Sequence, residues 1–557
     1  MTAEREPNGG AALVTALERN GVDIVFGIPG VHNLEIYRHL RGSGIRHVAV
    51  RHEQGAGYAA DGYARASGRP GVCLTTSGPA LTNACAAAGT AYADSVPVLV
   101  CSPGPSLGTE GRDLGLLHEM KDQQGHLETL VTASLRPRSA EEIGEVVDEV
   151  FAGWRRARPR PVHLEIPVDV LEGPWHPPAT AHTPSPLSPE VARLRRVFDA
   201  TAPPRGPGGD DVDERVRRAA SFLSTAERPL LVLGGGTRHA AVSARRLAER
   251  TRALVVTTVN GKGVLPERHP LSLGASIRLR ATRPLFESAD VVVVAGSELG
   301  DSDLWGVPIE VTGKVVRIDV DPHQLDKNLP STVAICMDAA AAFEELLRLL
   351  GPTGPPRATW SGSAEVLRSK LREEALVEGE PYEAINTALS EALSPSTIVA
   401  GDSAQVSYFG TAHFWPMDGP RQFLYPTGFS TLGYGLPAAV GARFACPETP
   451  AVVLVGDGGF LFTAMELLTA VERRLSLPVV IVDNHGYAEI REGMEERGIE
   501  PLAVDRPDVD FVAFAESLGA RGHAVSSVDE LCTRVLEALD TDLPTTISID
   551  ISKGVPS

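Results

Sequence analysis

The sequence has few cysteines, no long apolar run and little positive charge relative to negative charge. It has only six cysteines in 557 residues, and no two of them form a Cys-x-x-Cys pair. They are Cys73, Cys85, Cys101, Cys336, Cys446 and Cys532. Scattered cysteines of this kind argue against a disulfide framework or a zinc site, and they are typical of small core residues in a reducing compartment.

Long apolar runs are also missing. No stretch reaches the length of a membrane-spanning helix. Residues 1–10 are polar and charged, unlike a signal peptide. We therefore expect a cytoplasmic protein with no membrane partner.

Positive charge is scarce relative to negative charge. Lys and Arg together number 52, whereas Asp and Glu number 71, and the formal net charge is −19. This excess of acid argues against nucleic acid or an anionic membrane surface as a partner. The chain also lacks a Gly-x-x-x-x-Gly-Lys-Ser/Thr loop, which argues against a phosphate-binding nucleotide hydrolase.

The chain does have a regular alternation of apolar β-branched runs and helical segments, and it is too long for a single core. The alternation predicts an α/β fold made of three doubly wound parallel-sheet domains. The main predicted strands are 24–27, 48–51, 72–76, 96–101, 230–233, 255–259, 291–295, 315–320, 397–400, 451–455 and 479–482.

Two stretches rich in Pro and Gly interrupt this alternation. Each has the composition of a linker, and together they predict the domain boundaries. The predicted order is a first domain 1–175, a linker 176–213, a central domain 214–350, a linker 351–361 and a last domain 362–557.

In the central domain, Gly234, Gly235 and Gly236 follow a predicted strand, as the phosphate-binding turn of a dinucleotide fold does. The segment lacks a clean Gly-x-Gly-x-x-Gly pattern, and no clear acidic ribose ligand follows at the expected distance. We therefore favour a tight turn in a scaffold domain over a bound FAD or nucleotide.

Asp457 and Asn484 are the most informative residues, because each follows an apolar strand in the last third of the chain. A helix predicted at 463–475 joins the two strands into one strand–helix–strand unit. Parallel strands end at the same edge of a sheet, where ligands of open α/β sheets bind. A carboxylate, an amide oxygen and a backbone carbonyl opened by glycine suit Mg²⁺. A lone Asp-Gly is commonly an ordinary turn, but the pairing one unit apart favours a metal site.

Glu53 lies at the carboxyl end of another predicted strand, just before a predicted helix. A carboxylate in that place is commonly a cap or a partner of the helix dipole. Together with the metal motif, a second interpretation is a catalytic acid.

These residues lie in motifs that resemble the acetolactate synthase-like branch of the thiamine diphosphate enzymes. The motifs cover nearly the whole chain and comprise 27–30, 51–56, 60–65, 76–83, 433–439, and Gly456-Asp457-Gly458 followed by Asn484. The resemblance implies a pyrimidine-binding domain, a central domain and a diphosphate-binding domain, with thiamine diphosphate and Mg²⁺ as cofactors. It also implies a homodimer or homotetramer with active sites at the subunit interface.

The resemblance assigns roles to individual residues. The metal ligands would be the side chains of Asp457 and Asn484 and the backbone carbonyl of Gly486. Glu53 would be the catalytic acid beside the aminopyrimidine ring. The other cofactor-binding residues would be Gly30, Pro79, Asn83, Gln405, Leu432, Gly456, Gly458, Gly459 and Tyr487. The sequence departs from the family pattern at Asp483, where Asn is usual, which should keep the metal and make the strand end more acidic.

Three further residues concern catalysis and the substrate. His118 stands where acetolactate synthases carry a Gln beside the reacting centre, and a histidine there is either a proton shuttle or a surface-loop residue. His32 is a candidate for the lining of the site. Glu489 would pair with a guanidinium group, or it belongs to a solvated helix face.

Within that branch, the segments 30–38, 42–48, 116–119, 425–428 and 490–494 resemble the 5-guanidino-2-oxopentanoate decarboxylases. The predicted reaction is the non-oxidative decarboxylation of a 2-oxo acid, such as 5-guanidino-2-oxopentanoate, to an aldehyde and CO₂. One alternative is a carboligase that joins the decarboxylated donor to a second oxo acid or aldehyde. Another is a catalytically silent cofactor-binding protein, against which the retention of Glu53 argues.

Overall fold

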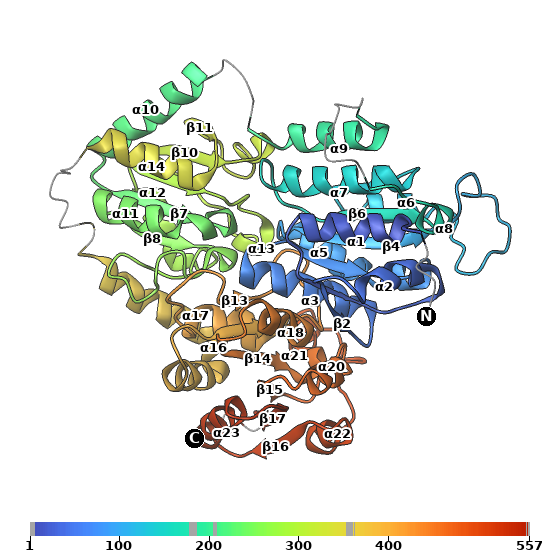
Figure 1. Ribbon diagram of the computed structural model, residues 1–557. Helices are drawn as coiled ribbons and strands as arrows, with labels where there is room; N and C mark the ends of the chain where they lie inside the picture. Colours follow the sequence, from blue (N-terminus) through green and yellow to red (C-terminus); the bar gives the residue numbers. More distant parts are fainter. Residues whose placement is uncertain are drawn as a thin grey trace. The chain divides into compact units, whose positions relative to one another are not determined.

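The structure is a computed structural model that describes residues 6–177, 187–203, 209–351, 360, 362–552 and 554. The chain divides into two compact units. The first comprises Met1–Ala200 with Val440–Cys446, and the second comprises Thr201–Ala439 with Pro447–Ser557. Figure 1 labels the helices and strands of both units.

The first unit contains one six-stranded sheet in the order β2-β1-β3-β4-β6-β5, and all its strand pairs are parallel. The strands are β1 (Ile24–Gly27), β2 (Arg46–Ala49), β3 (Gly71–Leu74), β4 (Val98–Gly104), β5 (Ala133–Leu135) and β6 (Val162–Pro167). All residues of β1, β3, β4, β5 and β6 are buried. Such apolar runs are expected of parallel strands that helices cover on both faces.

The helices of the first unit begin at residues that suit a helix N-terminus. They include α1 (Gly9–Arg19), α3 (Glu53–Ser67), α5 (Cys85–Ala93), α7 (Ala140–Trp154) and α9 (Pro189–Ala200). The side chains of Asn8 and Ser139 accept hydrogen bonds from the first turns of α1 and α7. Helices α1, α7 and α9 pack in one layer, and α3 packs against α5 (Figure 1).

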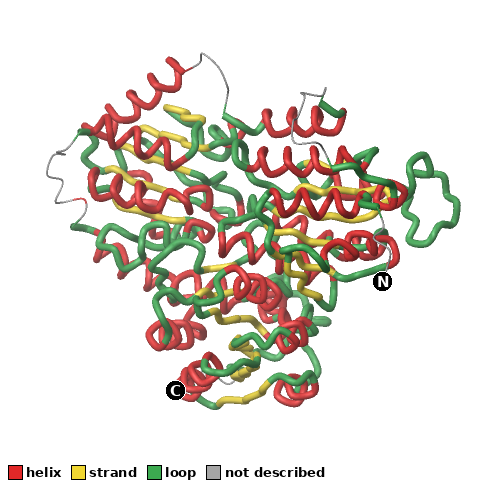
Figure 2. Tube along the Cα trace, viewed as in Figure 1, coloured by secondary structure: helices red, strands yellow, loops and turns green. Residues whose placement is uncertain are grey.

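The second unit contains two parallel sheets. The central sheet has the order β11-β10-β9-β7-β8, and the last sheet has the order β13-β12-β14-β15-β17-β16. The strands are β7 (Pro229–Leu233), β8 (Leu254–Thr257), β9 (Val291–Ala295), β10 (Lys314–Asp319), β11 (Val333–Cys336), β12 (Ile398–Gly401), β13 (Phe423–Leu424), β14 (Ala451–Gly456), β15 (Leu477–Asp483), β16 (Arg521–Val525) and β17 (Pro544–Asp550). Helices α10 (Gly209–Thr225) and α11 (Ala241–Thr251) pack on α14 (Ala339–Leu350), and α16 (Ala364–Ala392) packs on α23 (Val528–Leu539) (Figure 2).

The first four strands of each sheet, counted along the chain, share one order. In each, the second strand lies outside the first, and the third and fourth follow on the other side. This doubly wound order places the switch point, where open α/β sheets bind ligands, between the first and third strands. The switch points are therefore the carboxyl ends of β1 and β3, of β7 and β9, and of β12 and β14.

The predicted α/β fold of three parallel-sheet domains is confirmed. The strands predicted at 24–27 and 291–295 have those bounds. Strand β6 was not predicted, because the polar residues His163 and Glu165 interrupt its apolar pattern. Both are buried, and His163 lies between the hydroxyl groups of Ser102 (2.8 Å) and Ser134 (2.7 Å). Burial lowers the pKa of His163 to about 3, so the ring is neutral at pH 7.

The segment predicted as a linker at 176–213 contains helix α9 and the start of α10. Val191, Leu194 and Phe198 of α9 are buried at helical spacing, a pattern that the flanking Pro and Gly residues obscured. Residues 178–186 and 204–208 of this segment lie outside the described residues. Residues 352–359 and 361 of the second predicted linker also lie outside them.

Gly234, Gly235 and Gly236 follow β7 at the central switch point. The N–H of Gly236 donates to the carbonyl of Gly296 (3.0 Å), and a Cβ atom on Gly234 would meet that same carbonyl oxygen at 2.2 Å. The glycines therefore permit a close approach of two backbone segments. Within the ranges that the structure describes, no helix combines the length and the apolar character that crossing a membrane requires.

Candidate active site

The ends of β14 and β15 carry the residues predicted to bind a metal. The two strands pair in parallel with Gly456 opposite Val482, so the residues that follow them lie side by side. Asp457 begins the short helix α19 (Asp457–Phe460) and is 1% exposed. Helix α20 (Glu466–Glu472) connects the strands, as a shorter version of the helix predicted at 463–475. The pairing of the two strands thus fixes the backbone positions of Asp457 and Asn484.

Three oxygen-bearing groups meet at this edge. One end of the Asn484 side-chain amide lies 3.0 Å from the carbonyl oxygen of Gly486 and 3.2 Å from Oδ1 of Asp457. With its nitrogen there, the amide donates to both acceptors; with its oxygen there, three oxygens converge. Neighbouring ligands around an octahedral Mg²⁺ with bonds of about 2.1 Å are roughly 3 Å apart. The residues therefore fit a divalent cation held by one carboxylate, one amide and one carbonyl.

Electrostatics at Asp457 also favour a nearby cation. Burial raises the pKa of Asp457 above its ordinary value, and the neighbouring Asp483 raises it further, against the lowering effect of a hydrogen bond from Arg506. A divalent cation on the free oxygen would favour the ionised carboxylate. Among the described residues, this strand edge included, no cluster of three His, Cys, Asp or Glu side chains could hold a metal, so a cation here would need the amide and carbonyl oxygens as well.

The glycines of this edge occupy places that admit no side chain. A Cβ atom on Gly458 would lie 2.8 Å from the ring of Tyr487, and one on Gly459 would lie 2.6 Å from the carboxylate of Asp402. Gly486 has a φ of +149°, and a Cβ atom there would meet the carbonyl oxygen of Val504 at 2.1 Å. A side chain is therefore excluded at all three positions, because the backbone packs directly against Tyr487, Asp402 and Val504.

Asp402 organises the segment that contains Leu432, and the sequence motifs did not identify it as a site residue. It follows β12, and its carboxylate accepts hydrogen bonds from the N–H groups of Gly433 (3.1 Å) and Gly435 (2.6 Å). Burial raises the pKa of Asp402 to about 6, although these backbone hydrogen bonds lower it. The carboxylate thus fixes the chain around the half-buried Leu432.

Gln405 and Glu489 meet in a cavity of about 760 Å³ in the second unit. The amide nitrogen of Gln405 donates to Glu489 (3.1 Å) and Glu492 (2.9 Å), and its oxygen accepts from the hydroxyl of Tyr382 (2.7 Å). The hydroxyl of Tyr408 also donates to Glu489 (2.9 Å). Five glutamates and one arginine line the cavity, so it suits a cationic ligand.

In the first unit, the predicted residues follow three neighbouring strands. Gly27 of β1 lies opposite Ala49 of β2 and Leu74 of β3, so the three strands end at one level. Glu53 is the first residue of α3, and its carboxylate accepts a hydrogen bond from the side chain of Asn83 (2.9 Å).

Pro79 and Gly30 occupy the same edge of the sheet. Pro79 begins helix α4 (Pro79–Asn83). A Cβ atom on Gly30 would lie 2.8 Å from the side chain of Thr76. The structure therefore brings Glu53, Asn83, Pro79 and Gly30 to the carboxyl ends of β1, β2 and β3.

His32 and His118 face each other across Ser77, which the sequence motifs did not single out. Nδ1 of His32 lies 2.6 Å from the Ser77 hydroxyl, and Nδ1 of His118 lies 3.4 Å from it. The two rings are edge to face with their centroids 5.2 Å apart. Burial lowers the pKa of His32, and the nearby His118 lowers it further. Two imidazoles bridged by a hydroxyl can pass a proton between them.

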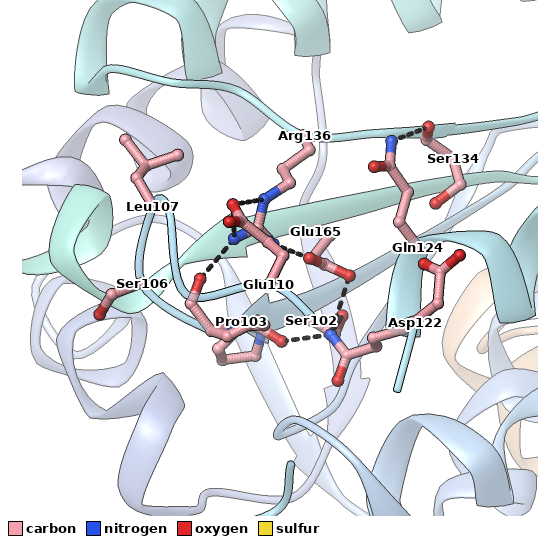
Figure 3. Close-up of polar contacts among 12 residues, drawn as sticks. Ser102, Pro103, Ser106, Leu107, Glu110, Asp122, Gln124, Ser134, Arg136 and Glu165 are labelled. Atoms are coloured by element: carbon pink, nitrogen blue, oxygen red, sulfur yellow. Dashed lines mark hydrogen bonds and ion pairs between the residues drawn. The ribbon is translucent and has the colours of Figure 1, made fainter. Parts of the chain in front are cut away.

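His118 lies on residues 105–122, a loop between β4 and helix α6 (Gln123–Glu128) that contains no helix or strand (Figure 2). Figure 3 shows the polar contacts at the base of this loop. Arg136 donates to the carbonyl of Pro105 (2.5 Å) and forms ion pairs with Glu110 (2.9 Å) and the buried Glu165. These contacts hold the start of the loop.

Gln123 holds the other end of the loop. Its side-chain nitrogen donates to the carbonyl of Pro103 (2.8 Å) and to Glu165 (3.1 Å), and its oxygen accepts from the N–H of Gly78 (2.8 Å). Gly78 has a φ of +61°, and a Cβ atom there would meet the carbonyl oxygen of His118 at 2.4 Å. The place of His118 therefore depends on a glycine and on an anchored loop.

The fold and both groups of residues belong to a three-domain α/β protein whose candidate site residues lie at the carboxyl ends of strands. Family models describe the same arrangement. The N-terminal thiamine pyrophosphate-binding domain matches residues 7–127, the central domain of these enzymes matches 216–346, and the C-terminal thiamine pyrophosphate-binding domain matches 404–549.

Several named proteins are similar to this chain over most of their length. A probable 2-ketoarginine decarboxylase of Pseudomonas aeruginosa is 40% identical over 95% of this chain and 92% of its own. A probable acetolactate synthase large subunit of Methanocaldococcus jannaschii is 31% identical, over 98% and 93% of the two chains. The large subunit of Escherichia coli acetolactate synthase isozyme 1 is 31% identical, over 92% and 88%.

The chain therefore belongs to the thiamine pyrophosphate enzyme family. It is a thiamine diphosphate-dependent enzyme of the class that contains 2-oxo acid decarboxylases and acetolactate synthase-like carboligases.

Substituting Asp402 with Asn should change how stability depends on pH. Burial raises the pKa of Asp402 to about 6 from 3.8, so between these values the folded protein binds the proton more tightly than the unfolded chain. Stability should therefore fall by ~1–3 kcal/mol as the pH rises through this range, and the fall should be absent in Asp402→Asn. Urea unfolding of both proteins across this range measures the two slopes. Parallel pH profiles would contradict the buried-carboxyl assignment.

Proposed function

We propose that the protein is a Mg²⁺-dependent decarboxylase that converts 5-guanidino-2-oxopentanoate to the corresponding aldehyde and CO₂. The observation that carries the proposal is the pair of carboxylates, Glu489 and Glu492, that share one amide donor in an acidic cavity. Two like charges held this close favour a cationic ligand. A guanidinium group binds carboxylates through paired hydrogen bonds. The 40% identity to a probable 2-ketoarginine decarboxylase supports the same substrate.

We assign the diphosphate-binding role to residues 362–557. Asp457, Asn484 and the carbonyl of Gly486 would hold Mg²⁺, which prefers such oxygen ligands. Gly458 and Gly459 would face the diphosphate through their backbone. The other cofactor contacts in this domain would be Gln405, Leu432, Gly456 and Tyr487.

We assign the pyrimidine-binding role to residues 1–175, with Gly30, Pro79 and Asn83 on the cofactor side. When bound, thiamine diphosphate supplies a carbon nucleophile and an electron sink for decarboxylation. Glu53 would exchange a proton with the aminopyrimidine ring, held in place by its hydrogen bond from Asn83 (2.9 Å). His118 would deliver the proton that completes the aldehyde, and His32 would contact it through the Ser77 hydroxyl.

The resemblance to the family also leads us to propose a cytoplasmic homodimer or homotetramer. Its active sites would combine Glu53 of one subunit with Asp457 of another. We propose neither nucleic acid nor a membrane as a partner of this assembly.

The second candidate function is an acetolactate synthase-like carboligase. The relatives named as acetolactate synthases, at 31% identity over more than 90% of this chain, favour it. Both functions share every step through the loss of CO₂, so only the carbon product separates them. Proton delivery gives the aldehyde, whereas attack on a second oxo acid or aldehyde gives an acyloin-type product.

The proposed substrate is tested by a neutral analogue of the same length. We expect 5-guanidino-2-oxopentanoate to exceed 5-ureido-2-oxopentanoate in kcat/KM by about 10²-fold or more, because only the guanidinium pairs with carboxylates. Glu489→Gln should remove most of this preference. CO₂ release and the carbon product are measured together for both substrates.

Glu495→Gln is the matched control, because Glu495 lies on the same helix, α21 (Ala488–Glu496), and does not line the cavity. It should keep the wild-type preference. Equal rates for both substrates in the wild type, or an unchanged preference in Glu489→Gln, would contradict the substrate assignment.

Glu53→Gln should bind thiamine diphosphate and yet exchange its C2 proton about two to four orders of magnitude more slowly than the wild type. The amide keeps the shape of the side chain and loses the acid. Exchange into deuterated water, followed by NMR after an acid quench, measures this rate without any substrate. A wild-type exchange rate in this variant would end the assignment of Glu53 as the catalytic acid.

A further inference from the structure

One guanidinium group binds two carboxylates at the cation site. Asp457 follows β14 and Asp483 ends β15, and the two strands pair in parallel. Nε of Arg506 forms an ion pair with Oδ2 of Asp457, and its Nη2 lies 2.5 Å from Oδ1 of Asp483. The side chain of Arg506 is 8% exposed, that of Asp457 is 1% exposed and that of Asp483 is 12% exposed. This is a largely buried three-charge cluster and not a surface pair.

Arg506 is held in this place by the segment that carries it. The N–H of Tyr487 donates to the carbonyl of Val504 (2.8 Å), and Gly486 and Asp505 form an antiparallel bridge. The segment therefore pairs directly with the loop that presents the Gly486 carbonyl. The guanidinium also lies over the ring of Phe511, 5.1 Å from its centroid. The position of Arg506 is thus coupled to the position of a predicted metal ligand.

The two carboxylate oxygens of Asp457 have different partners, and this difference indicates the role of Arg506. Oδ2 is bound by Arg506, whereas Oδ1 faces the Asn484 amide at 3.2 Å, where the oxygens converge. One oxygen is fixed by the arginine and the other is left for a cation. The two carboxylates and the guanidinium together carry one net negative charge. Without Asp483, the arginine would cancel the charge of Asp457 entirely.

We propose that Arg506 and Asp483 form a compensating charge pair that positions Asp457 and keeps the net charge beside the cation negative. Both are positioning residues that act through Asp457 and do not bind the metal themselves. The extra negative charge at Asp483, where the family pattern has Asn, is then compensated by the positive charge of Arg506, 23 positions further along the chain. This inference rests on the metal site of the proposed function.

The test compares Mn²⁺ affinity in variants of the whole protein, with thiamine diphosphate present and no substrate. Asp483→Asn keeps the side-chain oxygen that accepts from the N–H of His485 (2.9 Å) and removes only the charge. It should weaken Mn²⁺ binding about tenfold or more, because the arginine is then uncompensated. The double variant Asp483→Asn/Arg506→Gln should return to within about threefold of the wild type, because both charges are gone. Electron paramagnetic resonance of free Mn²⁺ measures each affinity.

The matched control is Asp542→Asn, which changes the net charge by the same amount in an exposed ion pair with Arg474. It should leave Mn²⁺ affinity within about twofold of the wild type. An Asp483→Asn variant that binds Mn²⁺ like the wild type would overturn the inference. So would a double variant that binds more weakly than Asp483→Asn alone. Absence of Mn²⁺ binding in the wild type would instead refute the metal site of the proposed function.

Discussion

The parallel pairing of β14 with β15 is the constraint on which the proposed chemistry depends. Because Gly456 lies opposite Val482, the chain leaves both strands at the same level, and Asp457 and Asn484 follow within two residues. The loop after Asn484 then turns at Gly486, whose φ of +149° suits glycine alone. Three oxygen-bearing groups from two strand ends thereby meet, and each needs only a short side chain or the backbone itself. A cation site built from strand ends costs little side-chain entropy.

The same strand order serves a different purpose in the first unit. There Glu53, His32 and Ser77 follow the ends of β2, β1 and β3, and His118 reaches Ser77 from the loop after β4. Among the described residues, no cluster of three His, Cys, Asp or Glu side chains could hold a metal. Candidate acid–base residues thus lie near the switch point of the first unit, whereas the candidate oxygen ligands follow β14 and β15, one strand beyond the switch point of the last sheet. Repetition of one topology with different terminal residues accounts for the two kinds of chemistry that a diphosphate cofactor with a reactive ring requires.

Sequence reasoning singled out the candidate site residues whose positions follow from local geometry. Asp457, Asn484 and Glu53 each stand directly after a recognisable strand, so their place follows from the strand alone. Arg506, Ser77 and Gln123 could not be identified in this way, because their roles depend on contacts between segments distant in the chain. Gln123, for example, binds Gly78 and Glu165, which lie about forty positions away on either side. Buried polar residues also concealed β6, and Pro-rich flanks concealed α9.

The most direct measurement is a crystal structure of the protein with thiamine diphosphate and Mn²⁺, in which anomalous scattering locates the metal. The account predicts one Mn²⁺ per chain, bound by Oδ1 of Asp457, the side-chain oxygen of Asn484 and the carbonyl of Gly486, with diphosphate oxygens completing its coordination. A metal bound at any other cluster, or a cofactor held without metal at these strand ends, would contradict it.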